Sequence, residues 1–299
     1  MKKIVITGSN GLLGQTLLNL LLKEPNSYQV FGLSRGENRS GRDDFPYHCI
    51  DITKQEQLRE CLLTIKPDVI VNTAAMTNVD ACEDQKNECQ QLNVEAVKYL
   101  TQIASALNSQ LIHISTDFIF DGEKGYYKEI DKAHPLSFYG ESKLISEEIL
   151  VNSDIHYTIL RTILVYGKVN NLGRNNIVLW VKEMLEKNKE ITIVDDQYRM
   201  PTYVDDLAMA CKISIDKSAQ GIFNISSNQL LSVFEIALQI AEVFQLNSSL
   251  IKPISTSKLN QKAPRPAKTG FDLSKTNKEL EFYPTSFKED LQRFKQTLI

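Results

Sequence analysis

The chain is poor in the features that several large classes of protein require. Its five cysteines are scattered and never form a CxxC pair, which disfavours both a disulfide framework and a zinc site. No stretch approaches the roughly 18 apolar residues of a membrane-spanning helix. Basic and acidic residues nearly balance, leaving a net charge of -3 and no basic block. We therefore expect no nucleic acid and no membrane among the partners.

The start of the chain also lacks the apolar stretch of a signal peptide. Ile4, Val5 and Ile6 follow two lysines, but Thr7 and Gly8 interrupt the run at once. With thiols in no disulfide pattern, this predicts a cytoplasmic protein. The four histidines are dispersed and the paired aspartates have no further ligands at suitable spacing, so no metal site is expected.

A regular alternation of apolar runs and amphipathic stretches occupies the first half. Strands are expected at 3–7, 29–33, 48–52, 68–72, 110–115 and 157–161, and helices at 12–22, 54–63, 85–107 and 139–151. Such repeats form right-handed crossovers onto a parallel sheet, and near-continuous apolar strands fit a sheet covered on both faces. The sequence therefore predicts an α/β fold with a doubly wound parallel Rossmann sheet.

The alternation of expected strands and helices becomes irregular beyond residue 166. Helices are expected at 177–187, 203–213 and 233–244, the last preceding a tail rich in Ser, Lys and Pro, and short strands at 191–194 and 221–225. We expect an NAD(P)-binding Rossmann domain over 1–166, with a return segment at about 202–227. A smaller C-terminal substrate-binding lobe would comprise 167–201 and 228–299.

Three glycines follow the first strand and open the first helix. Gly8 and Gly11 would allow a tight turn and the close approach of a pyrophosphate, and Gly14 would let the helix pack on the strand. The helix N-terminus offers free N–H groups and a partial positive charge. The spacing GxxGxxG differs from the dehydrogenase GxGxxG and indicates another branch of Rossmann enzymes. The residues predicted to bind the cofactor phosphates are Gly8, Asn10, Gly11, Leu12, Leu13 and Gly14.

The choice of cofactor depends on the end of the second strand. NAD enzymes place a carboxylate there for the ribose hydroxyls, whereas this strand ends in Arg35, with no acid until Glu37. An arginine suits a 2'-phosphate, so we expect NADPH to be preferred, with NADH as the alternative. Asp51 and Ile52, which end the third strand, would bracket the adenine; alternatively Asp51 caps the helix that starts near Thr53.

A hydroxyl, a phenol and an ammonium recur at Thr116, Tyr139 and Lys143. Tyr139 and Lys143 are four residues apart and share one helix face. An ammonium about 4 Å away attracts a phenolate by about 4 kcal/mol at an effective dielectric near 20, so the pKa of Tyr139 is expected to fall from 10. Thr116 ends the fifth strand, at the edge where open sheets bind ligands. The three residues suit carbonyl reduction with Tyr139 as the acid.

These motifs resemble the extended short-chain dehydrogenase/reductase superfamily and, within it, the dTDP-4-dehydrorhamnose reductase family. The resemblance runs from Lys3 to about Asp272. It is carried by ITGSNGLLG, NTAAMTNVDACE (72–83), LNVEA (92–96), STDFIFDG (115–122), YGESK (139–143), LRTILVYG (160–167), DQYRMPTY (196–203), Arg265-Pro266 and Phe271-Asp272.

The resemblance implies NAD(P)H-dependent reduction of the 4-keto group of a nucleotide-activated 6-deoxy sugar, in dTDP-rhamnose biosynthesis. It makes Tyr139 the proton donor, Lys143 the anchor of the nicotinamide ribose, and Thr116 a contact of the reacting sugar. Asn93 would brace backbone near the site or, alternatively, bond to a strand from a helix face. The implied cofactor contacts are Ala74, Ala75, Met76 and Thr77, and the implied substrate contacts are Val79, Thr116, Asp117, Leu164 and Arg265, the last suited to a diphosphate.

Three departures from the family pattern concern the substrate side. Leu164 replaces a common tryptophan, Arg199 stands where glycine is usual, and Phe271 precedes Asp272 in place of leucine. The identity of the sugar therefore stays open. Two alternatives also stay open: a sugar-nucleotide epimerase or dehydratase of the same superfamily, and a non-catalytic nucleotide-binding regulatory subunit. A homodimer is consistent with the long helices expected at 85–107 and 139–151, since such helices commonly form dimer faces in the superfamily.

Overall fold

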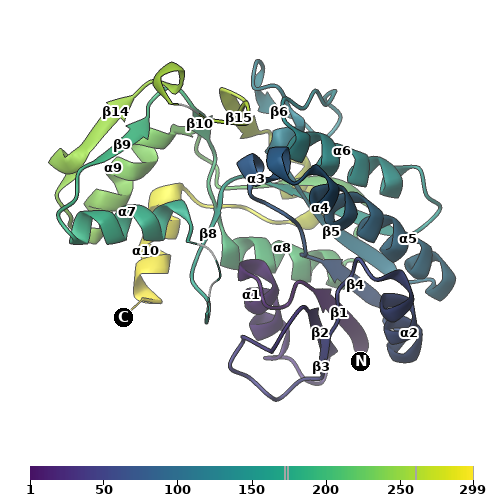
Figure 1. Ribbon diagram of the computed structural model, residues 1–299. Helices are drawn as coiled ribbons and strands as arrows, with labels where there is room; N and C mark the ends of the chain where they lie inside the picture. Colours follow the sequence, from purple (N-terminus) through teal and green to yellow (C-terminus); the bar gives the residue numbers. More distant parts are fainter. Residues whose placement is uncertain (172, 174, 260, 299) are drawn as a thin grey trace.

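The structure is a computed structural model that describes residues 1–171, 173, 175–259 and 261–298. Leu172, Arg174, Asn260 and Ile299 fall within the stretches expected to form the substrate lobe and lie outside the described residues. Figure 1 shows a layered α/β part beside a smaller part near the C-terminus.

Seven parallel strands form the central sheet, in the order β12-β7-β5-β4-β1-β2-β3. Their bounds are β1 (Lys2–Thr7), β2 (Tyr28–Ser34), β3 (Tyr47–Cys49), β4 (Val69–Asn72), β5 (Gln110–Thr116), β7 (Tyr157–Thr162) and β12 (Gly221–Ile225). The predicted doubly wound Rossmann sheet is confirmed. Strand order reverses between β1 and β4, so the carboxyl ends of these strands border the crevice where such sheets bind ligands.

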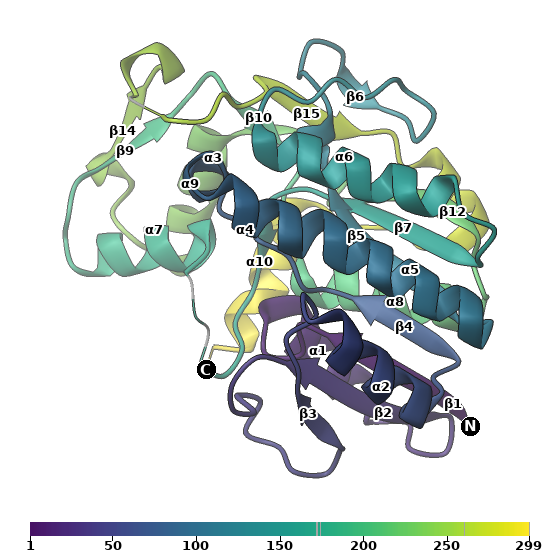
Figure 2. The same cartoon turned by 45° about the vertical axis from the view of Figure 1, so that its right-hand side comes forward.

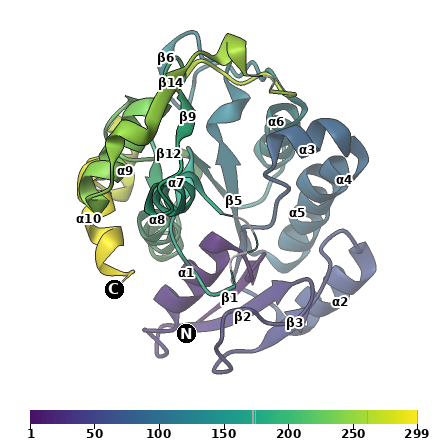
Figure 3. The ribbon, with the colours of Figure 1, turned by 60° about the vertical axis from the view of Figure 1, so that its left-hand side comes forward.

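Helices cover both faces of this sheet. On one face lie α1 (Leu12–Leu21) and α8 (Val204–Asp216), and on the other α2 (Gln55–Ile65), α5 (Ala96–Leu107) and α6 (Phe138–Val151). Figure 2 shows α5 and α6 in front of β5 and β7, and Figure 3 shows α1 and α8 on the opposite side from α5 and α6. The two apolar clusters are separate, which explains why the strands are apolar on both faces. None of the described helices is long and apolar enough to cross a membrane.

The remaining elements build the segments around the crevice and the smaller part. They are β6 (Gly125–Tyr127), α3 (Val79–Asp84), α4 (Lys86–Gln90), β8 (Val165–Tyr166), α7 (Ile177–Glu186), β9 (Ile191–Val194), β10 (Tyr198–Arg199), β11 (Thr202–Tyr203), β13 (Leu231–Ser232), α9 (Val233–Phe244), β14 (Ile251–Ile254), β15 (Lys268–Phe271) and α10 (Phe287–Gln296). A four-stranded sheet, β13-β10-β15-β6, includes β6 from the first half of the chain. This pairing joins the C-terminal segments to the loop between β5 and α6.

The expected elements differ from the observed ones in several places, and α3 and the strands of the smaller sheets other than β9 were not expected. The third strand ends at Cys49 and so is shorter than predicted, and the helix expected at 85–107 is α4, a π-helical turn (Gln91–Glu95) and α5 in succession. The expectation of no helix after residue 244 is wrong, because α10 follows. Its start carries a capping box of Ser286 and Glu289, and its apolar residues are buried. The polar composition of the tail concealed this signal.

A buried ion pair fixes α6 on the sheet. The Arg161 guanidinium on β7 donates to the Glu147 carboxylate on α6, with an Nη2–Oε2 distance of 2.7 Å, and through Nη1 to the Glu129 carbonyl. Both charged side chains are almost fully buried, so losing either partner would leave an uncompensated charge. The pair therefore sets the position of the helix that carries Tyr139.

Candidate active site

Thr116, Tyr139 and Lys143 lie close together at the carboxyl end of β5. Thr116 is the last residue of β5, and α6 begins just before Tyr139. The Ser137 hydroxyl caps α6 by accepting a hydrogen bond from the Gly140 N–H at 3.2 Å. All three site side chains are buried. Tyr139 and Lys143 occupy successive turns of one face, and the Thr116 hydroxyl lies close enough to the Tyr139 phenol to influence its pKa.

Gly140 permits α6 to touch the turn that follows Thr116. A Cβ atom at Gly140 would lie 2.2 Å from the Phe118 carbonyl oxygen and 3.0 Å from the Pro135 Cβ. The Phe118 ring meets the Tyr139 ring edge-on, with 5.8 Å between centroids. The distance between Thr116 and Tyr139 therefore depends on a close approach that only glycine allows at position 140.

The pKa of Tyr139 is raised from its ordinary value of 10. Burial is the main cause, the Thr116 hydroxyl acts in the opposite direction, and the Asp117 carboxylate adds to the rise. The expectation of a lowered pKa is therefore wrong for this structure, because desolvation of the phenolate by burial is the largest effect on the pKa. A phenol that stays protonated at neutral pH is the form that can donate a proton.

Lys143 is buried against β5. Burial lowers the pKa of Lys143 to about 8, while Glu147 and Cys89 act to raise it. Its Nζ lies 2.9 Å from Nε2 of His113, which is a buried residue in the middle of β5. This contact between strand and helix was not anticipated, because a histidine inside an apolar strand predicts only a core role.

Asn93 braces backbone beside the site. It lies in the π-helical turn before α5, a feature that often occurs at functional sites. Its Oδ1 accepts from the Met76 N–H at 2.8 Å, and its Nδ2 donates to the Met76 carbonyl at 3.1 Å and to Ser142 Oγ at 3.1 Å. Of the two alternatives that the sequence left open for Asn93, the structure shows the first, a side chain that braces backbone near the site.

The glycine turn packs as its residues predict. Gly8 has a φ of 68°, and a Cβ there would lie 2.8 Å from the Ala74 backbone nitrogen. A Cβ at Gly14 would lie 2.3 Å from the Gly8 carbonyl oxygen. Leu12 and Leu13 are the first residues of α1. The N–H groups at this end of the helix have no partner within the helix and point toward the glycine turn. The turn is thus a close-packed backbone cradle that fits a dinucleotide pyrophosphate.

Asn10 shapes one wall of this cradle. Its Nδ2 donates to the Glu37 carbonyl at 2.8 Å and to the Tyr47 hydroxyl at 3.0 Å, while its Oδ1 accepts from the Arg39 N–H at 2.8 Å. The side chain therefore holds the β2–β3 loop. Gly11 lies beside it and would need only a small shift to admit a Cβ, since the nearest atom is 3.1 Å away.

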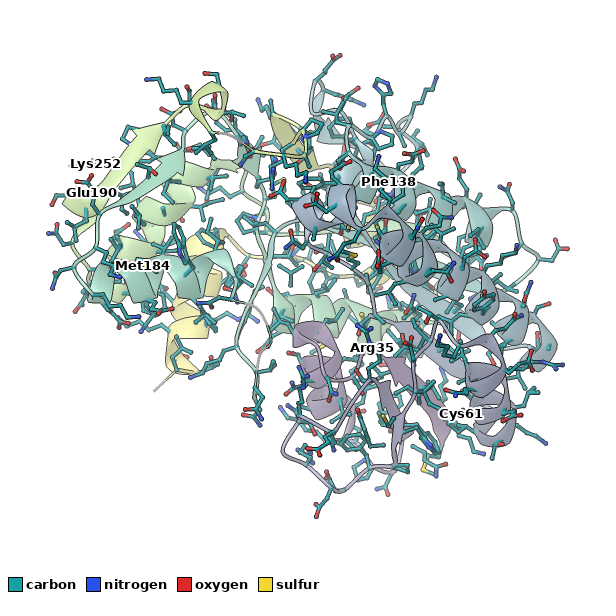
Figure 4. The ribbon with its side chains drawn as sticks, in the orientation of Figure 1. Arg35, Cys61, Phe138, Met184, Glu190 and Lys252 are labelled. Carbon is teal, nitrogen blue, oxygen red and sulfur yellow. The ribbon has the colours of Figure 1, made fainter. Side chains whose placement is uncertain are left out.

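Arg35 and Asp51 lie near each other beyond the ends of β2 and β3. Figure 4 shows Arg35 at the carboxyl end of β2, and its side chain is exposed. Asp51 Oδ1 accepts from the Thr53 N–H at 3.0 Å and from the Thr53 hydroxyl at 2.8 Å. Burial acts to raise the pKa of Asp51, but these two hydrogen bonds and the Arg35 charge lower it. Asp51 thus forms the turn before α2 but does not cap the helix, because the N-cap is Lys54 and no side chain makes a capping hydrogen bond. Ile52 beside it is buried.

The residues after β4 form an apolar wall beside Tyr139. Met76 and Val79 pack with Phe118 and Phe138 in the cluster that contains the Tyr139 ring. Ala74 lies against Gly8, as described above, and Ala75 and Thr77 belong to the same segment between β4 and α3. The segment therefore runs between the glycine turn and the phenol, where a cofactor would have to pass.

Asp117 pairs with the unexpected Arg199. The pKa of Asp117 is raised by burial, with the Arg199 charge opposing the rise. Arg199 Nε lies 3.8 Å from Asp117 Oδ2, and its two Nη groups donate to the Tyr198 and Pro266 carbonyls, each at 2.7 Å. Thr116 also donates to Asp117 Oδ1 at 3.2 Å. Arg199, at a position where the family usually has glycine, therefore binds groups within the protein. Through the Pro266 carbonyl it holds the segment that carries Arg265.

Arg265 and Leu164 are more exposed than the three buried site residues. The Arg265 guanidinium pairs with Asp80 on α3 at 2.7 Å and donates to the Ala263 carbonyl at 3.0 Å. Leu164 lies between β7 and β8 with a φ of 44°, a left-handed conformation that is strained for a non-glycine residue. Its side chain is 36% exposed. Among the described residues, no cluster of three or more His, Cys, Asp or Glu side chains could hold a metal ion.

This fold and this site define an oxidoreductase of the extended short-chain dehydrogenase/reductase class. The family model described as "RmlD substrate binding domain" matches residues 1–299. The chain is 33% identical over 310 residues to a dTDP-4-dehydrorhamnose reductase of Aggregatibacter actinomycetemcomitans, covering 99% of each chain. We conclude that the protein belongs to the RmlD, or dTDP-4-dehydrorhamnose reductase, family.

Two further relatives differ in what their names describe. A dTDP-4-dehydrorhamnose reductase structure from Bacillus anthracis, in complex with NADP, superposes with a TM-score of 0.88, at 28% identity and 99% coverage of both chains. The methionine adenosyltransferase 2 subunit beta of Rattus norvegicus is 32% identical over 279 residues, covering 92% of this chain and 81% of that protein. The chain is thus similar both to named enzymes and to a named subunit of another enzyme.

Proposed function

We propose that the protein uses NADPH to reduce the 4-keto group of a nucleotide-activated 6-deoxy sugar, as in dTDP-rhamnose biosynthesis. The observation that carries this proposal is the buried arrangement of Thr116, Tyr139 and Lys143 beside the glycine turn. Dehydratases of known structure have the same fold, but a relative that is 33% identical across the chain is named a reductase.

The residues of the chain divide the chemistry between them. When bound, the nicotinamide supplies the hydride. Thr116 would hold the substrate oxygen, and the protonated Tyr139 phenol would donate its proton to that oxygen as negative charge develops there. The Lys143 ammonium would then stabilise the phenolate and hold the cofactor ribose. Gly8 and Gly14 keep the turn closely packed, because a Cβ at either would meet backbone atoms.

The division of labour between the two parts of the chain is also a proposal. Residues 1–166 with 202–227 would bind the cofactor, and 167–201 with 228–299 would bind the sugar nucleotide. Arg265 would exchange its pairing with Asp80 for the substrate diphosphate, for which its planar fork is suited. Val79, Asp117 and Leu164 would complete the sugar site. The protein would work in the cytoplasm, where its free cysteines stay reduced.

The reductase proposal is tested by incubating the purified protein with a panel of 4-keto-6-deoxy sugar nucleotides and NADPH. We expect one NADPH to be consumed for each sugar reduced, followed by absorbance, with product stereochemistry determined by NMR. An epimerase or dehydratase would convert its substrate with no net consumption of NADPH, and that result would replace the proposal.

The preference for NADPH predicts a selective effect at Arg35. Replacing Arg35 with alanine should lower kcat/KM for NADPH by about 10- to 100-fold, the loss expected for a charge-assisted contact to a 2'-phosphate. The kcat/KM for NADH should stay unchanged. Arg59→Ala, on the exposed face of α2, is the matched control and should leave both values unchanged. Equal losses with both cofactors in Arg35→Ala would contradict the role.

A second candidate function is that of a nucleotide-binding subunit of another enzyme. The likeness to methionine adenosyltransferase 2 subunit beta favours it. The buried set of Thr116, Tyr139 and Lys143 counts against it, because a binding subunit has no need of an acid. Co-purification with a larger enzyme, together with no turnover on any keto-sugar of the panel, would favour this second function over the first.

A further inference from the structure

Arg199 is a buried cation beside the candidate site. Its side chain is 5% exposed and that of Asp117 is 3% exposed, with 3.8 Å between Arg199 Nε and Asp117 Oδ2. The guanidinium also lies over the Phe118 ring, 5.8 Å from the centroid. Burial lowers the pKa of Arg199, the Asp117 charge opposes this, and the Arg265 charge adds to it. A guanidinium nevertheless keeps its proton in proteins, so its burial here requires a counter-charge, and Asp117 is the carboxylate that faces it.

The hydrogen bonds of Asp117 fit a carboxyl group that has lost its proton. Its Oδ1 accepts from the Thr116 hydroxyl at 3.2 Å, and its Oδ2 accepts from the Thr269 hydroxyl on β15. Both oxygens thus act as acceptors, and the guanidinium beside them has only donors. Asp117 and Arg199 therefore form a buried pair of opposite charges.

This ion pair lies next to the acid of the proposed reaction. Asp117 follows Thr116 directly in the chain, and its carboxylate adds to the rise in the pKa of Tyr139 that burial causes. When Tyr139 gives up its proton, a phenolate forms near the Asp117 carboxylate, and two like charges in a buried site oppose each other. The positive charge of Arg199 offsets this repulsion.

The other titratable groups that act on this site come from three helices. Cys82 on α3 and Cys89 on α4 add to the rise in the pKa of Tyr139 that burial causes. On α6, burial lowers the pKa of Lys143 to about 8. These groups are the same in every variant of Arg199, so a comparison between variants separates their titration from that of the ion pair.

We propose that Arg199 is a positioning residue for the reaction: its guanidinium holds Asp117 in the ionised form beside Thr116 and offsets the carboxylate charge as Tyr139 releases its proton. The inference rests on the proposed function, because it assigns Arg199 to the same site. Without Arg199, Asp117 would be a buried carboxyl group with no counter-charge, and its pKa would rise to about 7 to 9. It would oppose the phenolate only at a pH high enough to remove its proton.

The test compares Arg199→Gln, which removes the charge but keeps a donor for the backbone carbonyls, with Arg199→Lys, which keeps a charge. NMR titration of 13Cγ-labelled aspartate, with the signal assigned by an Asp117→Asn variant, gives the pKa of Asp117. It should rise into the neutral range in the glutamine variant and stay near the wild-type value in the lysine variant. An unchanged titration in the glutamine variant, or an equal rise in the lysine variant, would overturn the proposal.

Turnover gives a second measurement, in which the double variant Arg199→Gln/Asp117→Asn is the reference. Lys143 titrates alike in the single and the double variant, so the ratio of their kcat values reports the charge of Asp117. As pH rises through the new pKa of Asp117, this ratio should fall by about tenfold, the factor that one pKa unit of repulsion represents. A ratio that is independent of pH would remove Arg199 from the reaction.

The dependence of stability on pH covers the case of a variant that folds poorly. In Arg199→Gln the folded-state pKa of Asp117 would lie above the unfolded value of about 3.9, so stability is lost as pH rises through the folded-state pKa. The Tm should therefore fall with pH in the single variant relative to the double variant. If the single variant does not fold at any pH, a folded double variant would support the proposal. A double variant that also fails to fold would overturn it, because Arg199 would then be needed for its carbonyl contacts.

Gln197→Leu is the control for a merely structural effect. Gln197 is a buried polar residue two positions before Arg199, and its amide donates to Thr256 Oγ1 at 3.0 Å. Its loss should lower the Tm without moving the titration of Asp117, and an equal rise in that pKa would overturn the proposal. Because the NMR titration needs no turnover, a failure to reduce any keto-sugar would defeat the proposed function alone. The titration would still decide whether Arg199 holds Asp117 in the ionised form.

Discussion

Replacing Tyr139 with phenylalanine is expected to lower kcat by about 10²- to 10⁴-fold while leaving NADPH binding unchanged. The phenol supplies general acid catalysis, which is typically worth that factor, and phenylalanine keeps the ring in its packing against Phe118. Burial raises the pKa of Tyr139, so the wild-type acid is protonated throughout the neutral range. The measurements are the steady-state turnover of the keto-sugar nucleotide that the wild type reduces and the affinity for NADPH from fluorescence titration.

Tyr166→Phe is the matched control for this prediction. Tyr166 is fully buried, and its hydroxyl has no hydrogen-bond partner among the described residues. Removing that hydroxyl should leave kcat unchanged and should not lower the Tm, because no bond is lost. Near-normal turnover in Tyr139→Phe, with the Tyr166 variant also active, would remove Tyr139 from the chemistry.

Much of the fold and of the candidate site could be predicted because the signals are local in the sequence. Gly8 has a φ of 68° in a tight turn, a Cβ at Gly14 would meet backbone atoms a few residues away, and Tyr139 and Lys143 are brought together by one turn of helix. The place of Thr116 in the site could be predicted from the rule that ligands bind at the carboxyl edge of a parallel sheet. Each inference depended on residues close in the chain or on one strand end.

The features that escaped prediction depend on contacts between distant segments. Arg199 is 82 positions from Asp117, and only the tertiary fold reveals that its donors are taken up by backbone carbonyls and that carboxylate. The contact of His113 with Lys143 likewise joins a strand to a helix 30 residues later. The direction of the Tyr139 pKa shift was missed because sequence spacing shows nearby charges but gives no measure of desolvation.

Replacing Gly140 with alanine is expected to lower kcat by about 100-fold and to destabilise the protein. The new Cβ would lie 2.2 Å from the Phe118 carbonyl oxygen, a backbone atom that cannot rotate away. The helix α6 must therefore move relative to the turn after Thr116, and a displacement of about 1 Å at a reacting group can cost about 10²-fold in rate. Turnover and the Tm of the purified variant are the measurements.

The sign of the stability change at Gly140 separates two physical effects. Helix propensity alone favours alanine over glycine by about 1 kcal/mol, so a free helix face would gain stability. Overpacking against Phe118 costs about 1 to 3 kcal/mol, and we expect it to prevail because Pro135 also crowds the position. Glu148→Ala, on the exposed face of the same helix, is the control and should leave kcat unchanged. A Gly140→Ala protein with raised Tm and full activity would show that α6 can approach the turn in another way, and the close contact would then have no part in placing Tyr139.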